Sequence, residues 1–278
     1  MTIPKFQKTI LTWYKKNRRD LPWRNTRDPY RILVSEIMLQ QTQVSRVIPK
    51  YKEFLRAFPS IQALAKAPRS EVLKTWSGLG YWRRALYLQQ TAKILCVGDL
   101  VSHKKTRFPK NPEELGKLPG IGHYTARALS CFAFNTSEAF LDTNIRRVYL
   151  HFFFPKRKNV SDKDILSIAQ KAVWKTNVRE WHYALFDYGA IVLKNKTINK
   201  RSRHYHKQSR FKGSFRFFRT RAVQFLLSSP ESKTPKKSLL QFVAREIKKS
   251  KALYSPVEII SALLQDNVLK ESKRGYFL

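Results

Sequence analysis

Residues 118–128 read LPGIGHYTARA and place two glycines, Gly120 and Gly122, one residue apart directly before a helical run. A Gly-x-Gly turn brings backbone N–H groups close to a phosphate without a Cβ clash, and the helix that follows adds the positive end of its dipole. Such a turn binds a DNA backbone without sequence preference. An ordinary connection between two helices is the alternative explanation, and the motif alone favours neither.

The charge of the whole chain favours a polyanionic partner. Among 278 residues, 55 Lys and Arg stand against 19 Asp and Glu, which gives a net charge of +36. A charge of this size attracts nucleic acid and repels other copies of the same chain, so we expect DNA as the partner and a monomer in solution. The length allows one large domain or two modest ones.

Cysteine content and hydropathy bear on cofactors and location. The two cysteines, Cys96 and Cys131, exclude a disulfide framework and any four-cysteine metal site. The opening stretch, MTIPKFQKTILTWYKKNRRD, is interrupted by lysines, and no run of about 18 apolar residues appears anywhere in the chain. We therefore expect an intracellular protein without a membrane segment, cytoplasmic or nucleoid-associated, or in a nucleus or organelle if its source is eukaryotic.

Three regions differ in pattern. Apolar residues recur at helical spacing from Pro4 to about Leu193, which predicts a mostly helical domain over residues 1–192. Residues 193–214 form a basic arm, and the stretch 193–221 holds eleven Lys or Arg and no acid. Residues 215–278 predict three short helices and a hairpin that turns at Lys273-Arg274-Gly275, an arrangement found in winged helices and in other small domains.

Two carboxylates stand out in this basic chain. Asp142 lies in FLDTNIRRVYL among apolar and basic residues, and Glu36 lies in the apolar helical run YRILVSEIMLQQTQV. The ordinary explanations are a helix N-cap for Asp142 and an exposed glutamate on an amphipathic helix for Glu36. A carboxylate partly buried beside apolar groups instead acquires a raised pKa, which suits it to donating a proton.

Four segments together resemble adenine DNA glycosylases of the MutY type, within the helix-hairpin-helix superfamily that includes endonuclease III. They are LPWRNTRDPYRILVSEIMLQQTQV, WSGLGYWRRALYL, LPGIGHYTARALS and FLDTNIRRVYL, in the family's order and near its spacing. The resemblance covers roughly residues 5–192. It implies a mostly α fold in which two helical subdomains flank an active-site cleft, to which the small C-terminal module is added.

The resemblance also implies the catalytic residues. It assigns to Glu36 the protonation of the adenine leaving group, to Asp142 the support of the sugar cation, and to Asn144 a contact with the developing charge. Tyr124 stands where strand-cleaving relatives carry a nucleophilic lysine, which implies a monofunctional glycosylase that leaves the abasic site uncut. Cleavage of an N-glycosidic bond needs two carboxylates in opposite protonation states.

Further positions match family residues that contact DNA or the extruded base. Gln41 and Tyr81 match side chains that fill the vacated place in the stack, and Trp23 and Arg24 resemble residues of the base pocket. For Trp82, core packing is the preferred explanation. The complete set of expected DNA and substrate contacts is Trp23, Arg24, Leu39, Gln40, Gln41, Thr42, Tyr81, Gly120, Gly122, His123, Thr125, Lys200, Arg201 and Arg203.

The chain departs from the family where most members hold a four-iron cluster. The cysteine positions of the C-x6-C-x2-C-x5-C pattern fall on Leu193, Lys200, Arg203 and Ser209, so we expect no iron–sulfur cluster, no metal and no other cofactor. The cations of the arm are expected to bind the DNA backbone in place of the cluster loop. His204 and His206 are expected to belong to this basic face, because they lack acidic or thiol partners in the sequence.

A second departure concerns the substrate. Residues 215–278 are too few for the hydrolase-like domain with which relatives read 8-oxoguanine, and Tyr183 stands where some relatives place a polar pocket residue. The leading prediction is excision of adenine opposite G or 8-oxoguanine from mismatched or damaged double-stranded DNA, in base excision repair. Two alternatives stay open. One is a thymine or uracil glycosylase acting on G mismatches, which usually lacks the glutamate, and the other is a non-catalytic DNA-binding protein, which has no reason to place two carboxylates in its contact surface.

Overall fold

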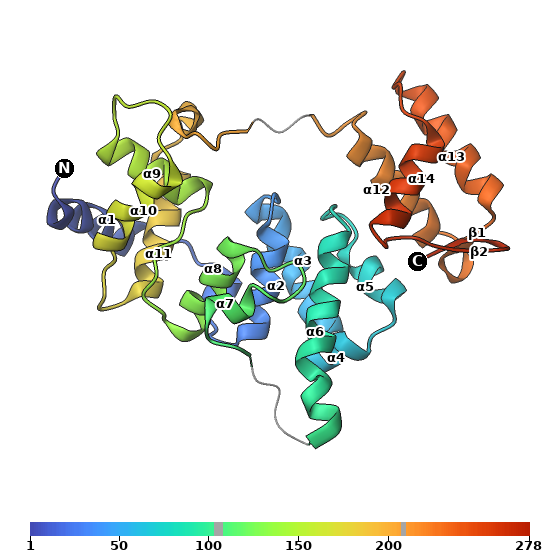
Figure 1. Cartoon of the computed structure of the whole chain (residues 1–278), viewed down its shortest axis with the longest axis horizontal. Helices are drawn as coiled ribbons and strands as arrows, with labels where there is room; N and C mark the ends of the chain where they lie inside the picture. The colour runs from blue at the N-terminus through green and yellow to red at the C-terminus, as the bar shows by residue number, and fades with distance from the viewer. Residues whose placement is uncertain (103–107, 207–209) are drawn as a thin grey trace. The chain divides into compact units, whose positions relative to one another are not determined.

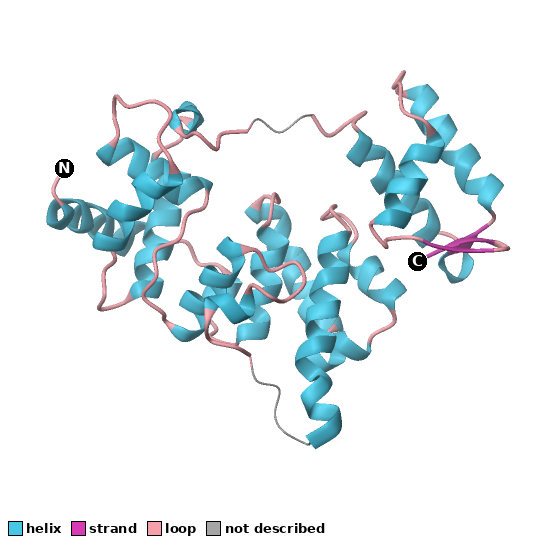
Figure 2. Ribbon diagram, viewed as in Figure 1, coloured by secondary structure: helices cyan, strands magenta, loops and turns pink. Residues whose placement is uncertain are grey.

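The computed structural model describes residues 1–102, 108–206 and 210–278, and these residues are mostly helical (Figure 2). The chain divides into two compact units, each made of two segments: Met1–Glu36 with Phe108–Lys207, and Ile37–Arg107 with Gln208–Leu278 (Figure 1). The predicted mostly α fold is confirmed. The linear boundaries at residues 192 and 214 stay a prediction, because each compact unit combines segments that are distant in the sequence.

The first unit carries the hairpin and is held together by aromatic packing. The ring of Phe6 lies 5.6 Å from that of Trp181 and 5.4 Å from that of Tyr149, and all three side chains are fully buried. The helices of this unit are α1 (Ile3–Asn17), η1 (Pro22–Arg24), the start of α2 (Pro29–Leu39), α7 (Pro112–Leu115), α8 (His123–Phe134), α9 (Thr143–Phe153), α10 (Asp162–Lys171), α11 (Val178–Asp187), η2 (Tyr188–Val192) and η3 (Lys196–Arg201).

Helices α7 and α8 form the predicted helix-hairpin-helix. Asn111 caps α7 by accepting a hydrogen bond from the amide of Glu113, and Pro112 occupies the first helical position, as the sequence predicts. Gly120 adopts φ = 74°, a left-handed conformation that glycine reaches without a Cβ penalty. The turn therefore depends on a glycine at this position.

The first segment of the second unit contains α3 (Val44–Ala57), α4 (Ile61–Lys66), α5 (Arg69–Trp76) and α6 (Arg83–Ser102). The ring of Trp76 packs 5.8 Å from that of Phe54 in the core. Trp82 is also buried, which confirms core packing as its explanation. No helix in the described ranges combines the length and the apolar character needed to cross a membrane.

The C-terminal residues form three helices and a small antiparallel sheet. In chain order they are α12 (Phe215–Leu227), η4 (Pro230–Ser232), β1 (Lys233–Thr234), α13 (Lys236–Lys249), α14 (Pro256–Gln265), β2 (Lys270–Ser272) and β3 (Gly275–Phe277), and the strands are ordered β1-β3-β2. This succession of elements is that of a winged helix. Lys273 and Arg274 make the turn, and Gly275, which was expected in it, already begins β3. A Cβ at Gly275 would collide with the carbonyl group of Thr234 in β1, so the position requires glycine.

Candidate active site

Glu36 lies on the buried face of α2 in the first unit. Its side chain is 5% exposed, and the hydroxyl of Tyr124 donates a hydrogen bond to its Oε2 at 3.1 Å. The pKa of Glu36 is raised to about 7: burial is the main cause and the charge of Asp142 adds to it, while the bond from Tyr124 and the charge of Arg24 act in the opposite direction. The explanation as an exposed glutamate is therefore wrong. The carboxyl group is poised to hold and release a proton near neutral pH.

Asp142 is the N-cap of α9, so the simple structural role predicted for it as a helix cap is correct. Its Oδ1 accepts hydrogen bonds from the amides of Asn144 (2.9 Å) and Ile145 (2.6 Å), and its Oδ2 accepts one from the Asn144 side chain (3.0 Å). Burial is the largest influence and leaves the pKa of Asp142 above its ordinary value, although these three bonds lower it. The bonds and the positive end of α9 favour the charged form. With three hydrogen bonds against one for Glu36, Asp142 is the member of the pair suited to remain an anion.

Tyr124 stands in the first turn of α8, next to the hairpin. The N-cap of α8 is Gly122, which has no side chain to cap the helix, and a Cβ built on it would meet nothing within 4 Å. His123 is exposed at this end of the helix. Thr125 is buried, so its side chain is not available to a ligand there. The hairpin thus presents an open helix N-terminus of the kind that binds phosphate.

Arg147 and Gly189 both contact Asn144, and neither was predicted from the sequence to have a role at the site. Nη1 of Arg147 donates to the carbonyl of Gly189 (2.7 Å) and to Oδ1 of Asn144 (3.3 Å). Gly189 lies in the π-helix η2, where its Cα hydrogens face the backbone of Asn144. A lone glycine within the apolar run LFDYGAIV was the available signal for this close approach.

We expect Gly189→Ala to lower the free energy of unfolding by about 1–3 kcal/mol, because a Cβ would lie 2.9 Å from the carbonyl carbon of Asn144. The first turn of α9 would have to move, and catalysis should fall with it. Thermal unfolding and single-turnover base release measure the two effects. Gly116→Ala is the matched control, since Gly116 is the C-cap of α7 with an ordinary right-handed backbone, and its Cβ would lie no closer than 3.3 Å to a neighbouring atom. Equal behaviour of the two variants would disprove the close-packing requirement.

Arg24, expected in the base pocket, is fixed by a buried acid. Its Nη1 and Nη2 each donate to Asp187 at 2.8 Å, and Nε of Arg19 donates to the same carboxylate at 2.6 Å. These cations and their hydrogen bonds hold the pKa of Asp187 below its usual range. The guanidinium carbon of Arg24 also lies 4.4 Å from the ring centre of Tyr183. The neighbouring Trp23 is buried.

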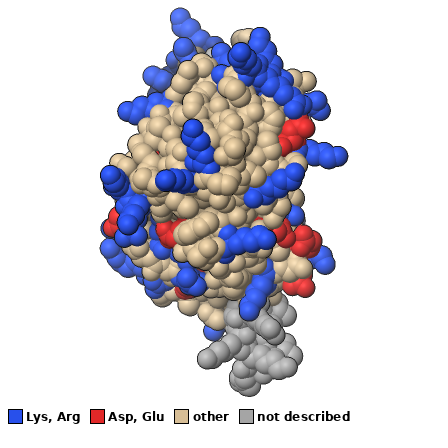
Figure 3. All heavy atoms as spheres, turned by 90° about the vertical axis from the view of Figure 1, so that its left-hand side faces the viewer, with Lys and Arg blue, Asp and Glu red and all other residues tan. Residues whose placement is uncertain are grey.

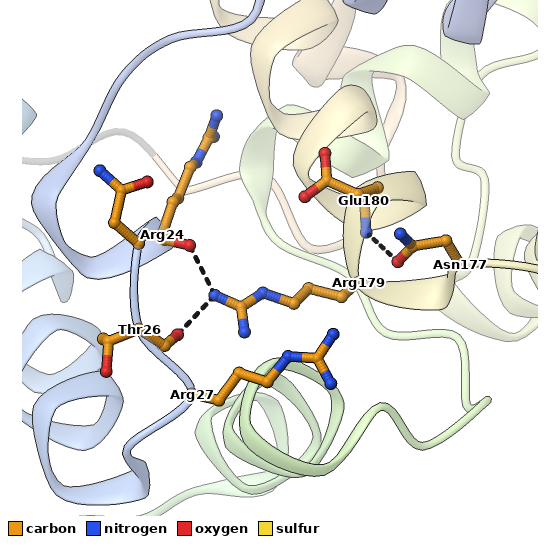
Figure 4. A pocket seen from close by; sticks show the side chains of 7 residues that line it. Arg24, Thr26, Arg27, Asn177, Arg179 and Glu180 are labelled. Carbon is orange, nitrogen blue, oxygen red and sulfur yellow. Dashed lines mark hydrogen bonds between the residues drawn. The ribbon is translucent and has the colours of Figure 1, made fainter.

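A polar pocket of about 320 Å³ opens beside this segment (Figure 4). The guanidinium of Arg179 donates to the carbonyls of Arg24 (2.8 Å) and Thr26 (2.6 Å) through Nη2 and to that of Phe132 (2.8 Å) through Nη1. Figure 4 shows Arg179 reaching across to the loop that carries Arg24 and Thr26. Arg179 therefore holds the Arg24 loop in place against α8 and α11.

In the second unit, Gln41 and Tyr81 sit at exposed turns with left-handed backbones. Their φ angles are 55° and 49°, although neither is a glycine. Gln41 is exposed and Tyr81 is 37% exposed, whereas Leu39, Gln40 and Thr42 are half-buried. A left-handed backbone costs energy in residues other than glycine, so the surrounding structure must hold both turns in place.

The basic arm is anchored by the backbone and by Arg147. The amide of Val160 donates to the carbonyl of Arg201 (2.8 Å), that of Arg203 donates to the carbonyl of Val160 (3.0 Å), and Nε of Arg147 donates to Asn199 Oδ1 (3.3 Å). Lys200 and Arg203 are exposed and Arg201 is half-buried. On the face drawn in Figure 3, Lys and Arg are widely spread and outnumber Asp and Glu.

The residues of the arm do not fit a four-iron cluster. Leu193, Lys200 and Arg203 occupy three of the four cysteine positions, and the fourth, Ser209, lies outside the described residues, as does part of the predicted arm. Cys96 and Cys131 are both buried and belong to different units. Across the described ranges, no group of three or more His, Cys, Asp or Glu gathers to hold a metal ion.

Comparison with known proteins places this arrangement in a family. Residues 34–175 match the HhH-GPD superfamily base excision DNA repair protein. An adenine DNA glycosylase of Buchnera aphidicola subsp. Baizongia pistaciae (strain Bp) is 40% identical over 201 residues, which are 69% of this chain and 54% of the relative. A thymine/uracil-DNA glycosylase of Methanothermobacter thermautotrophicus is 33% identical over 190 residues, which are 67% of this chain and 84% of the relative.

A solved structure agrees with this match. The structure of a thermostable thymine-DNA glycosylase superposes with a TM-score of 0.60 at 32% identity, covering 69% of this chain and 88% of that chain. The chain belongs to the HhH-GPD superfamily of base excision DNA repair proteins, and its resemblance to adenine DNA glycosylases is confirmed. It spans 54% and 61% of the length of two such adenine glycosylases.

Proposed function

We propose that this chain is a monofunctional DNA glycosylase of base excision repair that hydrolyses the N-glycosidic bond of adenine mispaired with G or 8-oxoguanine. The state of Glu36 carries the proposal: a carboxyl group buried in α2, with a pKa raised to about 7, beside a second carboxylate whose charged form is favoured by three hydrogen bonds. Burial raises the pKa of both groups, but Asp142 accepts three hydrogen bonds against one for Glu36, and such unequal surroundings suit Glu36 to the role of acid and Asp142 to that of anion.

The chemistry follows from this pair. Glu36 donates its proton to a ring nitrogen of adenine, the bond from the base to C1′ breaks, and its electron pair leaves with the base. The resulting sugar cation is stabilised by Asp142, with the side chain of Asn144 beside it. Water then adds to C1′ and gives up a proton to the Glu36 carboxylate, which restores the acid. Tyr124 holds Glu36 in place and offers no amine, so no Schiff base forms and the abasic strand stays intact.

Binding to duplex DNA is proposed for three groups of residues. The open end of α8 at Gly122 binds the backbone, the cations at Lys200, Arg201 and Arg203 bind phosphates without a cluster, and Gln41 and Tyr81 fill the place that the extruded base leaves. The large positive charge supports action as a monomer.

A thymine or uracil glycosylase is the second candidate. The observation in its favour is the match to a thymine/uracil-DNA glycosylase over 84% of that protein's length. Glu36 argues for adenine, because a purine leaves readily only when a proton donor stands beside it. A non-catalytic DNA-binding protein gains no support from a buried carboxyl with a raised pKa.

Single-turnover base release from end-labelled duplexes tests the proposal. The duplexes carry A opposite 8-oxoguanine, A opposite G, T opposite G or U opposite G, and each reaction is developed with and without alkali. We expect alkali-dependent cleavage at adenine alone. Cleavage only at T or U would transfer the chain to the second candidate, and binding without release from any duplex would refute glycosylase activity.

The pH dependence of base release provides a further prediction. Glu36 must be protonated to act, so the rate should be level below about pH 7 and fall roughly tenfold per pH unit above it. The bond from Tyr124 lowers the pKa of Glu36, so its removal in Tyr124→Phe should shift the fall to higher pH. A pH–rate profile of both proteins measures this, and an unchanged or acid-shifted midpoint in the variant would contradict the assignment.

A further inference from the structure

Arg84, in the first turn of α6, joins two separate loops of the second unit through one buried guanidinium. Nη1 donates to the carbonyls of Ile37 (2.9 Å), Met38 (3.1 Å) and Gln40 (2.6 Å) at the end of α2. Nη2 donates to the carbonyls of Leu79 (3.0 Å) and Gly80 (3.1 Å) and to the hydroxyl of Thr42 (3.2 Å). Nη1 thus bonds only to the segment that ends α2, and Nη2 bonds both to Thr42 just after that segment and to the loop before Tyr81.

The two loops are those that present Gln41 and Tyr81. Both residues have left-handed backbones, and Gly78 and Gly80 beside Tyr81 also have positive φ angles, of 94° and 68°. For residues other than glycine, such as Gln41 and Tyr81, this backbone conformation persists only where surrounding contacts hold it. The bonds of Arg84 fall on both sides of Gln41 and directly before Tyr81, and the guanidinium carbon lies 5.4 Å from the Tyr81 ring centre.

The charge of Arg84 is costly for the fold. Burial lowers the pKa of Arg84 to about 10, so the group remains charged at neutral pH. Within the described part of the chain, no carboxylate pairs with Arg84, and its Nε has no hydrogen-bond partner. An apolar side chain in such an interior often gives a fold as much stability as a buried charge does, so stability alone does not explain Arg84. A guanidinium differs in being a planar group that donates hydrogen bonds to several carbonyls at once.

We propose that Arg84 is a positioning residue that locks the Gln40–Thr42 loop to the Leu79–Tyr81 loop, so that Gln41 and Tyr81 enter the base stack as one fixed wedge. The inference rests on the proposed function, because the wedge matters only to a protein that extrudes a base. It predicts that a substitution of Arg84 slows excision most where unstacking and unpairing the target base costs the most free energy. That work is smallest for a base without a partner.

The test compares excision of adenine opposite 8-oxoguanine with excision of adenine opposite a tetrahydrofuran abasic analogue. In Arg84→Lys, which keeps the charge and loses the fork, we expect single-turnover release to slow by about 100-fold for the paired adenine and by less than about threefold for the unpaired one. In Arg84→Ala, millimolar methylguanidinium should restore part of the loss, and methylammonium should not. An equal loss on both duplexes, or no loss, would overturn the proposal.

Gln89→Leu is the matched control for general destabilisation. Gln89 lies in the same helix, is 4% exposed, and donates to the carbonyls of Ala67 (2.8 Å) and Leu64 (3.3 Å), away from both loops. We expect its loss to lower the melting temperature while leaving the ratio of the two excision rates unchanged. A ratio that moves as it does in Arg84→Lys would assign the effect to destabilisation and overturn the proposal.

A second measurement tests the role of Arg84 in base extrusion separately from the proposed cleavage of the glycosidic bond. In the Glu36→Gln background, fluorescence of 2-aminopurine at the target position reports extrusion without base release. We expect adding Arg84→Lys to lower the fluorescence gain at saturating protein. If the wild-type chain released no adenine while this gain still depended on Arg84, the proposed reaction would fail and the positioning role would stand. A gain that is unaffected by Arg84→Lys would refute the positioning role.

Discussion

Glu36→Gln is expected to slow single-turnover release of adenine by about 10²–10⁴-fold while leaving DNA binding unchanged. The amide keeps the volume of the carboxyl group and accepts the hydrogen bond of Tyr124, but it has no proton to give. The same substitution should increase the stability of the fold at high pH. Because the pKa of Glu36 rises from 4.5 to about 7 on folding, the wild-type protein loses about 3 kcal/mol of stability in all as the pH rises from 4.5 to 7.

Glu36→Gln should therefore have a larger free energy of unfolding than the wild type at pH 8, and the difference between the two proteins should be much smaller at pH 5. Denaturant unfolding at the two pH values measures this, alongside the release assay. Glu53→Gln is the control, since Glu53 is half exposed and pairs with Lys50 at the surface. A Glu36→Gln variant that kept the wild-type rate would remove the general acid from the mechanism.

Asp142→Asn is expected to reduce the rate by about 10²–10³-fold, because the sugar cation loses its neighbouring anion. Stability should change little. Asparagine caps helices about as well as aspartate, and its carbonyl can still accept hydrogen bonds from the amides of Asn144 and Ile145. The expected result is a folded, DNA-binding and slow enzyme, measured by single-turnover release and thermal unfolding.

Ser161→Ala supplies the opposite control for Asp142→Asn. Ser161 caps α10 through the amide of Asp164, so its loss should cost about 1 kcal/mol of stability without changing the rate. If Asp142→Asn instead lost stability and kept its rate, Asp142 would be a structural cap only.

The parts of the site that could be predicted from the sequence are those encoded locally. The hairpin at residues 118–128 carries its glycines and its helix in one stretch, and Asp142 caps the helix that directly follows it. The hairpin near the C-terminus was visible for the same reason. The two-residue strand β1 was not, because it is too short to show alternation and is defined only by its pairing with β3.

The residues that sequence reasoning missed act over long separations. Asp187 accepts hydrogen bonds from Arg24, more than 160 positions away in the sequence, and Arg84 donates hydrogen bonds to carbonyls of residues more than 40 positions away. Every residue has a backbone carbonyl whatever its type, so no sequence pattern identifies an arginine whose partners are backbone carbonyls. For Glu36 the sequence showed an apolar setting, but only the packed fold could show that this setting raises its pKa.

The proposed mechanism depends on a protonated Glu36, and a carbon-13 NMR titration of the glutamate side chains measures this protonation. With uniformly labelled protein, we expect one glutamate carboxyl with a midpoint near pH 7, present in the wild type and in Glu53→Gln and missing in Glu36→Gln. In Tyr124→Phe the same signal should move to higher pH. A wild-type protein in which every glutamate titrates near pH 4–5, the ordinary range, would contradict the account.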